Sequence, residues 1–204
     1  ENVCAVPEGT EDALYVVVKR TIDSKVVRYI ERVSSRYFDD VVDATFMDSF
    51  LTYDGRNSSA VTMTMTGSTW VYTVTLTLTS SAAFFASTDV GNQIFLTGTD
   101  GTVIRFTIGA YTSTTVVTGN AHKTVTVASG LRNAATSTWT HAVDQLTGLW
   151  HLEGEDVAVF ADGFVVASPN NSAYTTRTIT NGTLTLDKPY GVIHVGLPIT
   201  ADIE

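Results

Sequence analysis

The chain has 204 residues, with 21 acidic side chains against 12 lysines and arginines and a formal net charge of −9. This acidity argues against a protein that reads nucleic-acid sequence, because such a protein needs a basic surface to neutralise phosphates. The single cysteine, Cys4, excludes an internal disulfide and a multi-cysteine metal site. No apolar run reaches the length of a membrane-spanning helix, so we expect no stable membrane insertion.

Only 16% of the residues are charged, and threonine supplies much of the polar surface. Threonine is β-branched and fits a half-exposed pleated surface. Such a surface suits a protein that works against other protein surfaces. The acidity either keeps the protein soluble or forms a negative wall past which nucleic acid can slide. The chain starts with Glu1 rather than Met, and we expect it to be part of a longer polypeptide.

The first predicted element is a β-hairpin, with strands at 14–22 and 26–33 around a polar turn. Its basic residues could form an interface, although such charges more often discourage pairing at a sheet edge. One predicted face carries Val16, Val18 and Ile22, and the other carries Tyr15, Val17, Lys19 and Thr21. A short helical turn is possible within 34–43, and a strand is expected at 45–55.

Residues 61–140 are rich in threonine and poor in charge. The segment 70–79 alternates strictly, which predicts one half-buried antiparallel strand. Its buried side chains should be Tyr72, Val74, Leu76 and Leu78, with the intervening threonines exposed. Further short strands are expected at 93–96, 103–108 and 114–117. The turns between them are marked by Asp89, Gly91, Asp100 and Gly101.

The last section resembles the first in composition, and strands are expected at 157–161, 164–167, 183–186 and 190–195. Residues 168–172 read as a loop. The dipeptides Asp162-Gly163 and Asn181-Gly182 predict two-residue hairpin turns. Together these patterns predict an all-β fold: an antiparallel β-domain formed by 1–57 and 143–204, with a small β-barrel or β-sandwich module inserted at 58–142.

No constellation of residues predicts catalysis, a metal site or a cofactor. The carboxylates best placed for acid–base chemistry are Glu153, Glu155, Asp156 and Asp162, but Asp162 is also what a tight hairpin requires. The histidines lack metal-binding spacing; they are His122, His141, His151 and His194. Nucleotide-binding and hydrolase motifs are absent from the sequence. Aromatic residues could include a platform that stacks on a sugar, although those within apolar alternation usually pack in a core; they are Trp70, Tyr72, Phe84, Phe85, Trp139 and Trp150.

Two stretches, 146–154 and 157–163, resemble a pattern in the tail nozzle proteins of short-tailed bacteriophages. The same family shows an Asn-Gly turn like Asn181-Gly182, a closing sequence like 195–198, and an early portion similar to 7–31. The framework residues that match this pattern are Leu149, His151, Leu152, Glu153, Gly154, Gly196, Leu197 and Pro198. Three stretches of the middle segment, 85–94, 101–108 and 113–117, look like a small β-module of phage structural proteins that is sometimes labelled as similar to a β-domain of ubiquitin-activating enzymes. We take that label as a similarity of fold alone.

The resemblance implies a virion structural protein at the distal end of the tail tube, made in the host cytoplasm. It further implies a homo-oligomeric ring, expected to be a hexamer, that contacts tail adaptor and fibre proteins. DNA would pass through the ring during ejection without sequence recognition. The alternative is a module that binds or degrades host-surface glycan. A sugar binder should expose an aromatic pair beside acids and amides, and an enzyme should hold two carboxylates in one cleft.

Overall fold

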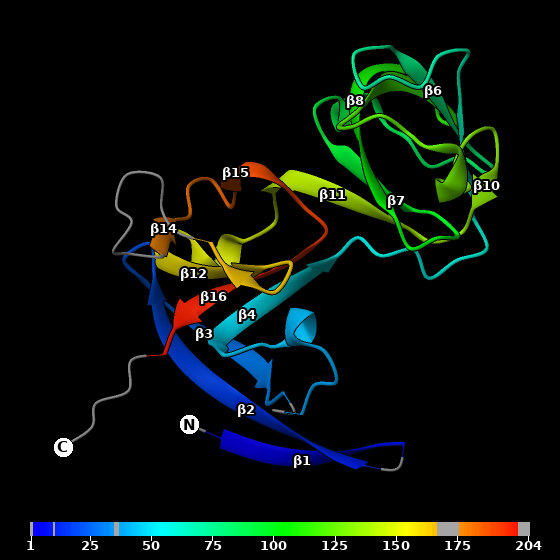
Figure 1. The fold of residues 1–204 in the computed structure, drawn as a ribbon. Coiled ribbons are helices and arrows are strands. Elements are labelled where there is room, and N and C mark those ends of the chain that lie inside the picture. The colour runs from blue at the N-terminus through cyan, green and yellow to red at the C-terminus, as the bar shows by residue number, and fades with distance from the viewer. Residues whose placement is uncertain (1, 10, 35–36, 167–175, 200–204) are drawn as a thin grey trace. The chain divides into compact units, whose positions relative to one another are not determined.

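The computed structural model describes residues 2–9, 11–34, 37–166 and 176–199 (Figure 1). In these ranges the regular structure consists of β-strands in three antiparallel sheets and four short 3-10 helices, without an α-helix. The all-β prediction is therefore confirmed. The loop predicted at 168–172 lies outside the described residues. No helix of the described chain is long and apolar enough to cross a membrane.

The chain divides into two compact units. Unit 1 comprises Glu1–Tyr53, Gln145–Thr185 and Ile193–Glu204, and unit 2 comprises Asp54–Asp144 and Leu186–Val192. In sequence, unit 2 interrupts unit 1. The finer assignment of 58–142 as an inserted barrel or sandwich stays a prediction.

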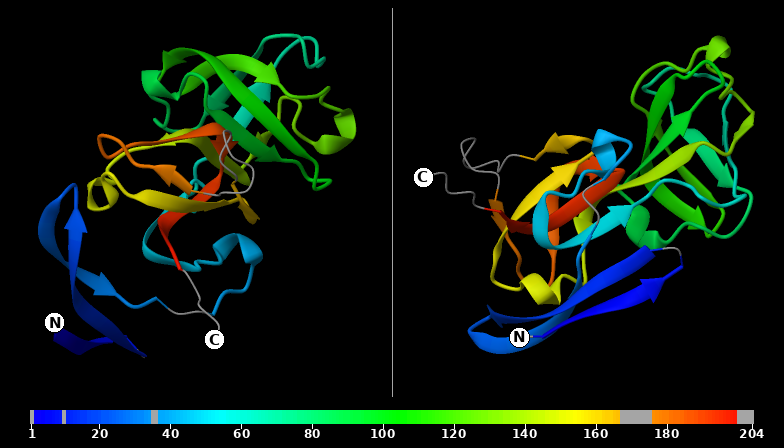
Figure 2. Two further views of the ribbon diagram at one scale, coloured as in Figure 1. Left: turned by 90° about the vertical axis from the view of Figure 1, so that its left-hand side faces the viewer. Right: turned by 90° about the horizontal axis from the view of Figure 1, so that it is seen from below.

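The first sheet of unit 1 contains β1 (Asn2–Glu8), β2 (Glu11–Ile22) and β3 (Lys25–Arg32) in that order, as Figure 2 shows in blue. Asp23 and Ser24 both have positive φ and form the two-residue turn between β2 and β3. This confirms the predicted hairpin. Strand β1 was not predicted, because every residue of that strand is exposed and no apolar alternation marks it.

The second sheet of unit 1 has the order β13-β12-β16-β4, with β14 also paired to β12. Its central strand β16 is buried on both faces over residues 192–196, which explains its near-continuous apolar run. The strands are β4 (Met47–Asp54), β12 (Asp156–Ala161), β13 (Phe164–Val165), β14 (Thr176–Thr178) and β16 (Val192–Pro198). Two 3-10 helices, η1 (Val41–Asp43) and η4 (Trp150–Leu152), also belong to this unit.

The third sheet supplies the core of unit 2. Its order is β10-β5-β6-β9-β8-β7-β11-β15, and within the described residues it is open rather than a closed barrel. Phe106, Leu78 and Ile94 are fully buried in its core. The strands are β5 (Met63–Thr66), β6 (Leu76–Ser80), β7 (Gln93–Thr97), β8 (Val103–Ser113), β9 (Val116–Ala121), β10 (Ala135–Thr136), β11 (Trp139–Leu146) and β15 (Leu184–Tyr190). Helices η2 (Ser87–Asp89) and η3 (Val127–Ser129) lie in its connections.

The predicted strand at 70–79 is only half right. Leu76 and Leu78 are buried in β6 as expected, but residues 70–75 are not in a strand, and Tyr72 is 57% exposed. The Val74 amide donates to the carbonyl of Val71 at 3.0 Å and closes a turn. The period-2 pattern therefore continues through a segment that forms a local turn instead of a strand, and alternation alone cannot reveal this.

We expect Leu78→Ala to lower the free energy of unfolding by about 2–5 kcal/mol, because it leaves a cavity in the core of unit 2. Tyr72→Ala is the matched control and should change stability by no more than about 0.5 kcal/mol. Urea unfolding of both variants checks this. Equal losses from the two substitutions would show that the 70–75 segment is part of the core after all.

Candidate functional site

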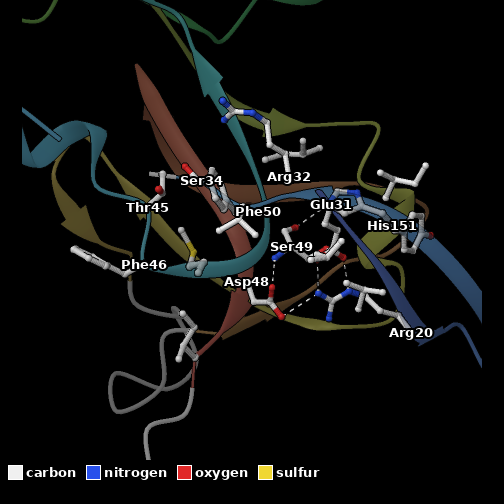
Figure 3. A pocket seen from close by; sticks show the side chains of 18 of the residues that line it. Arg20, Glu31, Arg32, Ser34, Thr45, Phe46, Asp48, Ser49, Phe50 and His151 are labelled. Carbon is white, nitrogen blue, oxygen red and sulfur yellow. Dashed lines mark hydrogen bonds and ion pairs between the residues drawn. The ribbon is translucent and has the colours of Figure 1, made fainter. Parts of the chain in front are cut away.

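Unit 1 contains a cavity of about 1090 Å³ (Figure 3). Strands β2, β3 and β4 supply most of its wall, and His151 of η4 and Pro198 of β16 are among the other lining residues. Apolar side chains such as Val16 and Val18 line it together with charged ones. The volume is of the order that small-molecule sites have, roughly 300–1,000 Å³.

The charged part of the wall is organised around Arg20. Its guanidinium forms a bidentate pair with Glu31, at 2.7 and 2.9 Å, and a third contact of 3.0 Å with Asp48. The side chains of Arg20 and Glu31 are only 14% and 18% exposed. Hydrogen bonding to Glu31, followed by the contact with Asp48, raises the pKa of Arg20 above its ordinary value. The pair with Glu31 joins β2 to β3, and the contact with Asp48, whose side chain is 53% exposed, joins the hairpin to β4.

His151 makes the second connection to β4. Its Nε2 lies 3.2 Å from the carbonyl oxygen of Ser49, which can only accept, so Nε2 carries the proton. Ser49 has a φ of +50°, an uncommon conformation for a residue with a side chain. The ring edge of His151 also meets Tyr29 of β3, at 6.4 Å between ring centroids. Burial lowers the pKa of His151, and the hydrogen bond to Ser49 opposes that shift.

Ser49, His151 and Glu31 are not arranged as a nucleophile, base and orienting acid. The imidazole contacts the carbonyl of Ser49 rather than its hydroxyl. The hydroxyl lies 3.3 Å from Glu31, whose carboxylate is neutralised by Arg20. A nucleophilic serine needs a base within reach of its own oxygen. The geometry therefore suits binding and structural support rather than acyl transfer.

The structure brings together two segments that the sequence singled out separately. The carboxylate of Glu153 accepts the backbone amides of Asn181 and Gly182, at 2.9 and 2.6 Å. The Leu149 amide donates to the Gly182 carbonyl at 2.9 Å. Trp150 lies directly on the turn, since a Cβ at Gly182 would come within 2.7 Å of its ring. A side chain at that position would displace the indole.

The remaining framework residues lie in or beside η4 and at the end of β16. Leu149 and Leu152 are buried, and the Gly154 amide donates to the Ile179 carbonyl at 3.0 Å. Gly196, Leu197 and Pro198 lie in the last part of β16, where Pro198 borders the cavity.

The predicted turn residues occupy four separate connections. Asp162 and Gly163 join β12 to β13 with φ of +49° and +83°, and Asn181 and Gly182 have φ of +54° and +62°. In unit 2, Gly91 follows η2 with a φ of +101°. The carboxylate of Asp89 accepts the Ala86 amide at 2.8 Å. Asp100 and Gly101 lie between β7 and β8, where the backbone amide and then the hydroxyl of Thr102 lower the pKa of Asp100.

The other candidate acids and histidines are dispersed. Asp156 begins β12 and accepts the Thr178 hydroxyl, while Glu155 lies just before that strand.

His194 is buried in unit 1, with Nε2 donating to the Val42 carbonyl at 2.8 Å and Nδ1 lying 2.7 Å from the Thr52 hydroxyl. His141 of unit 2 lies 3.6 Å from Asp89; burial lowers its pKa, and the Asp89 charge opposes this shift. Burial also lowers the pKa of His122. Within the described ranges, no three His, Cys, Asp or Glu side chains gather closely enough to bind a metal ion.

Sequence reasoning missed Glu31, Asp48 and Ser49 as parts of a site. Glu31 and Asp48 follow Arg20 by 11 and 28 residues, and only the fold makes them neighbours. The one signal available in the sequence was the position of Arg20 on the same face as Val16 and Val18. A cation on an apolar face needs a partner of opposite charge.

Comparison with known proteins supplies no further identification: the sequence matches no protein-family model, and the search of curated proteins found no match.

We expect Gly163→Val to lower the free energy of unfolding by about 1 kcal/mol or more, because a β-branched residue is strained at positive φ. Gly163→Asn should cost less, since asparagine tolerates this conformation. Thermal unfolding of the two variants checks the order. A Gly163→Val variant with unchanged melting but lost ligand binding would assign this turn to a ligand site.

Stability should also depend on the protonation of His151. Its pKa is lowered in the folded state, so the unfolded state binds the proton more tightly and stability is lost as pH falls below about 6.5. His151→Gln removes this titrating group and should flatten the decline between pH of about 7.5 and 5.5. Urea unfolding across that range checks it. An unchanged slope in the variant would mean that His151 contributes nothing to the pH dependence.

Proposed function

We propose that this chain is a virion structural protein: part of the tail nozzle of a short-tailed bacteriophage, contributing to a ring-shaped conduit for DNA ejection and to the docking of tail components. The observation that best supports this is the joining of η4 to the Asn181-Gly182 turn. Residues that carry the resemblance, far apart in sequence, form one framework in unit 1. Their contacts are structural rather than catalytic, as expected of a shared scaffold.

The first sheet of unit 1 gives further support. Only Ala13 and Ile22 of its described residues are buried, although its strands are rich in valine and isoleucine. Val3, Val26 and Ile30 are 64%, 58% and 76% exposed. A three-stranded sheet that leaves apolar side chains in water suits a protein whose contacts are completed by neighbouring subunits.

The proposal includes several finer parts. The protein acts without catalysis or a cofactor in the virion, where it forms a hexameric ring with tail adaptor and fibre proteins as neighbours. DNA passes through the ring without sequence recognition. Residues 58–142 form a barrel or sandwich module inserted in a host domain made of 1–57 and 143–204. The net charge of −9 supports passage of DNA, since like charges discourage adhesion.

One observation favours the alternative, a glycan-binding or polysaccharide-degrading tail module. Trp150 is 62% exposed and lies beside an acid, Glu153, and an amide, Asn181. Exposed indole rings can stack on sugars. However, the Glu153 carboxylate is already bonded to two backbone amides, which gives it a structural role.

Light scattering on this chain and on a longer polypeptide containing it tests the assembly. We expect the chain alone to be monomeric or weakly associated, because a stable ring interface needs on the order of 1,000 Å² or more. The longer polypeptide should form closed particles with its tail partners.

Two results would contradict the proposal. One is a longer polypeptide that stays monomeric beside its tail partners, together with tight glycan binding that Trp150→Ala abolishes. The other is polysaccharide turnover that disappears in Glu153→Gln or Asp162→Asn.

A further inference from the structure

The β1–β2–β3 sheet has a second face that strand alternation turns away from Arg20 and the cavity wall. On this face Val17 lies opposite Ile30, Lys19 opposite Arg28, and Thr21 opposite Val26. We define the basic face as Val17, Lys19, Val26, Arg28 and Ile30. Lys19 and Arg28 are exposed, as are Val26 and Ile30, although Ile30 also borders the cavity at the sheet edge.

The charges on the basic face are unfavourably placed in the single chain. Lys19 and Arg28 are directly cross-strand partners, and like charges in that position destabilise a sheet. Neighbouring cations of the sheet each have a carboxylate: Arg20 pairs with Glu31, Lys25 with Asp23, and Arg32 with Glu8. Among the residues that the structure describes, neither Lys19 nor Arg28 forms such an ion pair. The basic face therefore fits a partner that is both acidic and apolar.

A surface of that kind exists elsewhere in unit 1. We define the acidic patch as Phe38, Asp39, Asp40, Val41 and Phe46, all of which are exposed, although Phe46 also borders the cavity that Ile30 borders. The rings of Phe38 and Phe46 meet edge to face at 5.4 Å, so they form one apolar surface. The Asp40 side chain caps η1 by accepting the Val42 amide at 3.2 Å. The carbonyl of Val42 in turn accepts from the buried His194, which fixes η1 in place.

We propose that the basic face of one copy binds the acidic patch of a second copy of this chain. The two surfaces are complementary in charge, and each presents apolar side chains next to its charges. Because they are different patches, the contact is head-to-tail and propagates to a third copy, closing into a ring where the rotation permits. The inference rests on the proposed function and deepens it by naming the subunit interface.

The contact should be weak in this chain alone, because ten side chains bury less area than a stable interface needs. It should also depend on salt, since its charges are exposed and screened at distances beyond about 8–10 Å at moderate ionic strength. Sedimentation velocity at high protein and low salt concentration is therefore the appropriate measurement.

A charge-swap experiment tests the interface. Lys19→Glu/Arg28→Glu reverses the basic face, and Asp39→Lys/Asp40→Asn reverses the acidic patch while asparagine keeps the cap on η1. Each variant alone should associate about tenfold more weakly than the wild type, a change of ~1.4 kcal/mol. An equal mixture should associate again, because each variant retains one native surface. Lys123→Glu, an exposed charge reversal outside both surfaces, is the control and should behave like the wild type.

The rescue on mixing separates a lost interface from a misfolded variant. The interface proposal is overturned when the wild type associates but the charge swaps have no effect. It is also overturned when mixing the two variants fails to restore binding. Neither result bears on the nozzle proposal. A wild type that does not associate at all but binds vesicles containing phosphatidylserine through Lys19 and Arg28 would also overturn the interface proposal, assigning the face to a membrane surface. The nozzle proposal fails separately, when the longer polypeptide does not assemble.

Discussion

The buried ion pair between Arg20 and Glu31, extended to Asp48, is the contact on which the candidate site depends. The first sheet of unit 1 contributes almost nothing to a hydrophobic core, so polar contacts hold it against β4. The hydrogen bond from His151 to Ser49 joins η4 to β4, and the His151 ring also meets Tyr29 of the hairpin. These contacts hold the hairpin while its apolar side chains stay in water. The cavity lies between the hairpin and β4.

The framework around η4 follows a similar logic. A 3-10 helix, a carboxylate and a two-residue turn are linked mainly through backbone groups, with Glu153 satisfying two amides that the turn leaves free. This arrangement tolerates substitution of most side chains around it, but it requires a hydrogen-bond acceptor at position 153 and glycine at position 182.

Local chemistry made part of this structure predictable. The turn pair Asp162-Gly163 and the hairpin of β2 and β3 could be read because their signals lie within a few residues. The alternation at 70–75 misled because this segment forms a turn, closed by the Val74 amide and the Val71 carbonyl, instead of a strand. Strand β1 gave no signal, since a fully exposed strand needs no apolar pattern. The pairing of Arg20 with Asp48 could not be read at all, because it depends on how distant segments pack.

We propose that neighbouring subunits, rather than the rest of its own chain, complete the first sheet of unit 1. Amide hydrogen exchange of residues 2–32, compared between the dilute chain and an assembled longer polypeptide, measures this. We expect rapid exchange in β1 and β3 of the dilute chain and strong protection after assembly, while β6 and β8 of unit 2 stay protected in both. Protection of β1 and β3 in the dilute chain equal to that of β6 and β8, with no change on assembly, would contradict it.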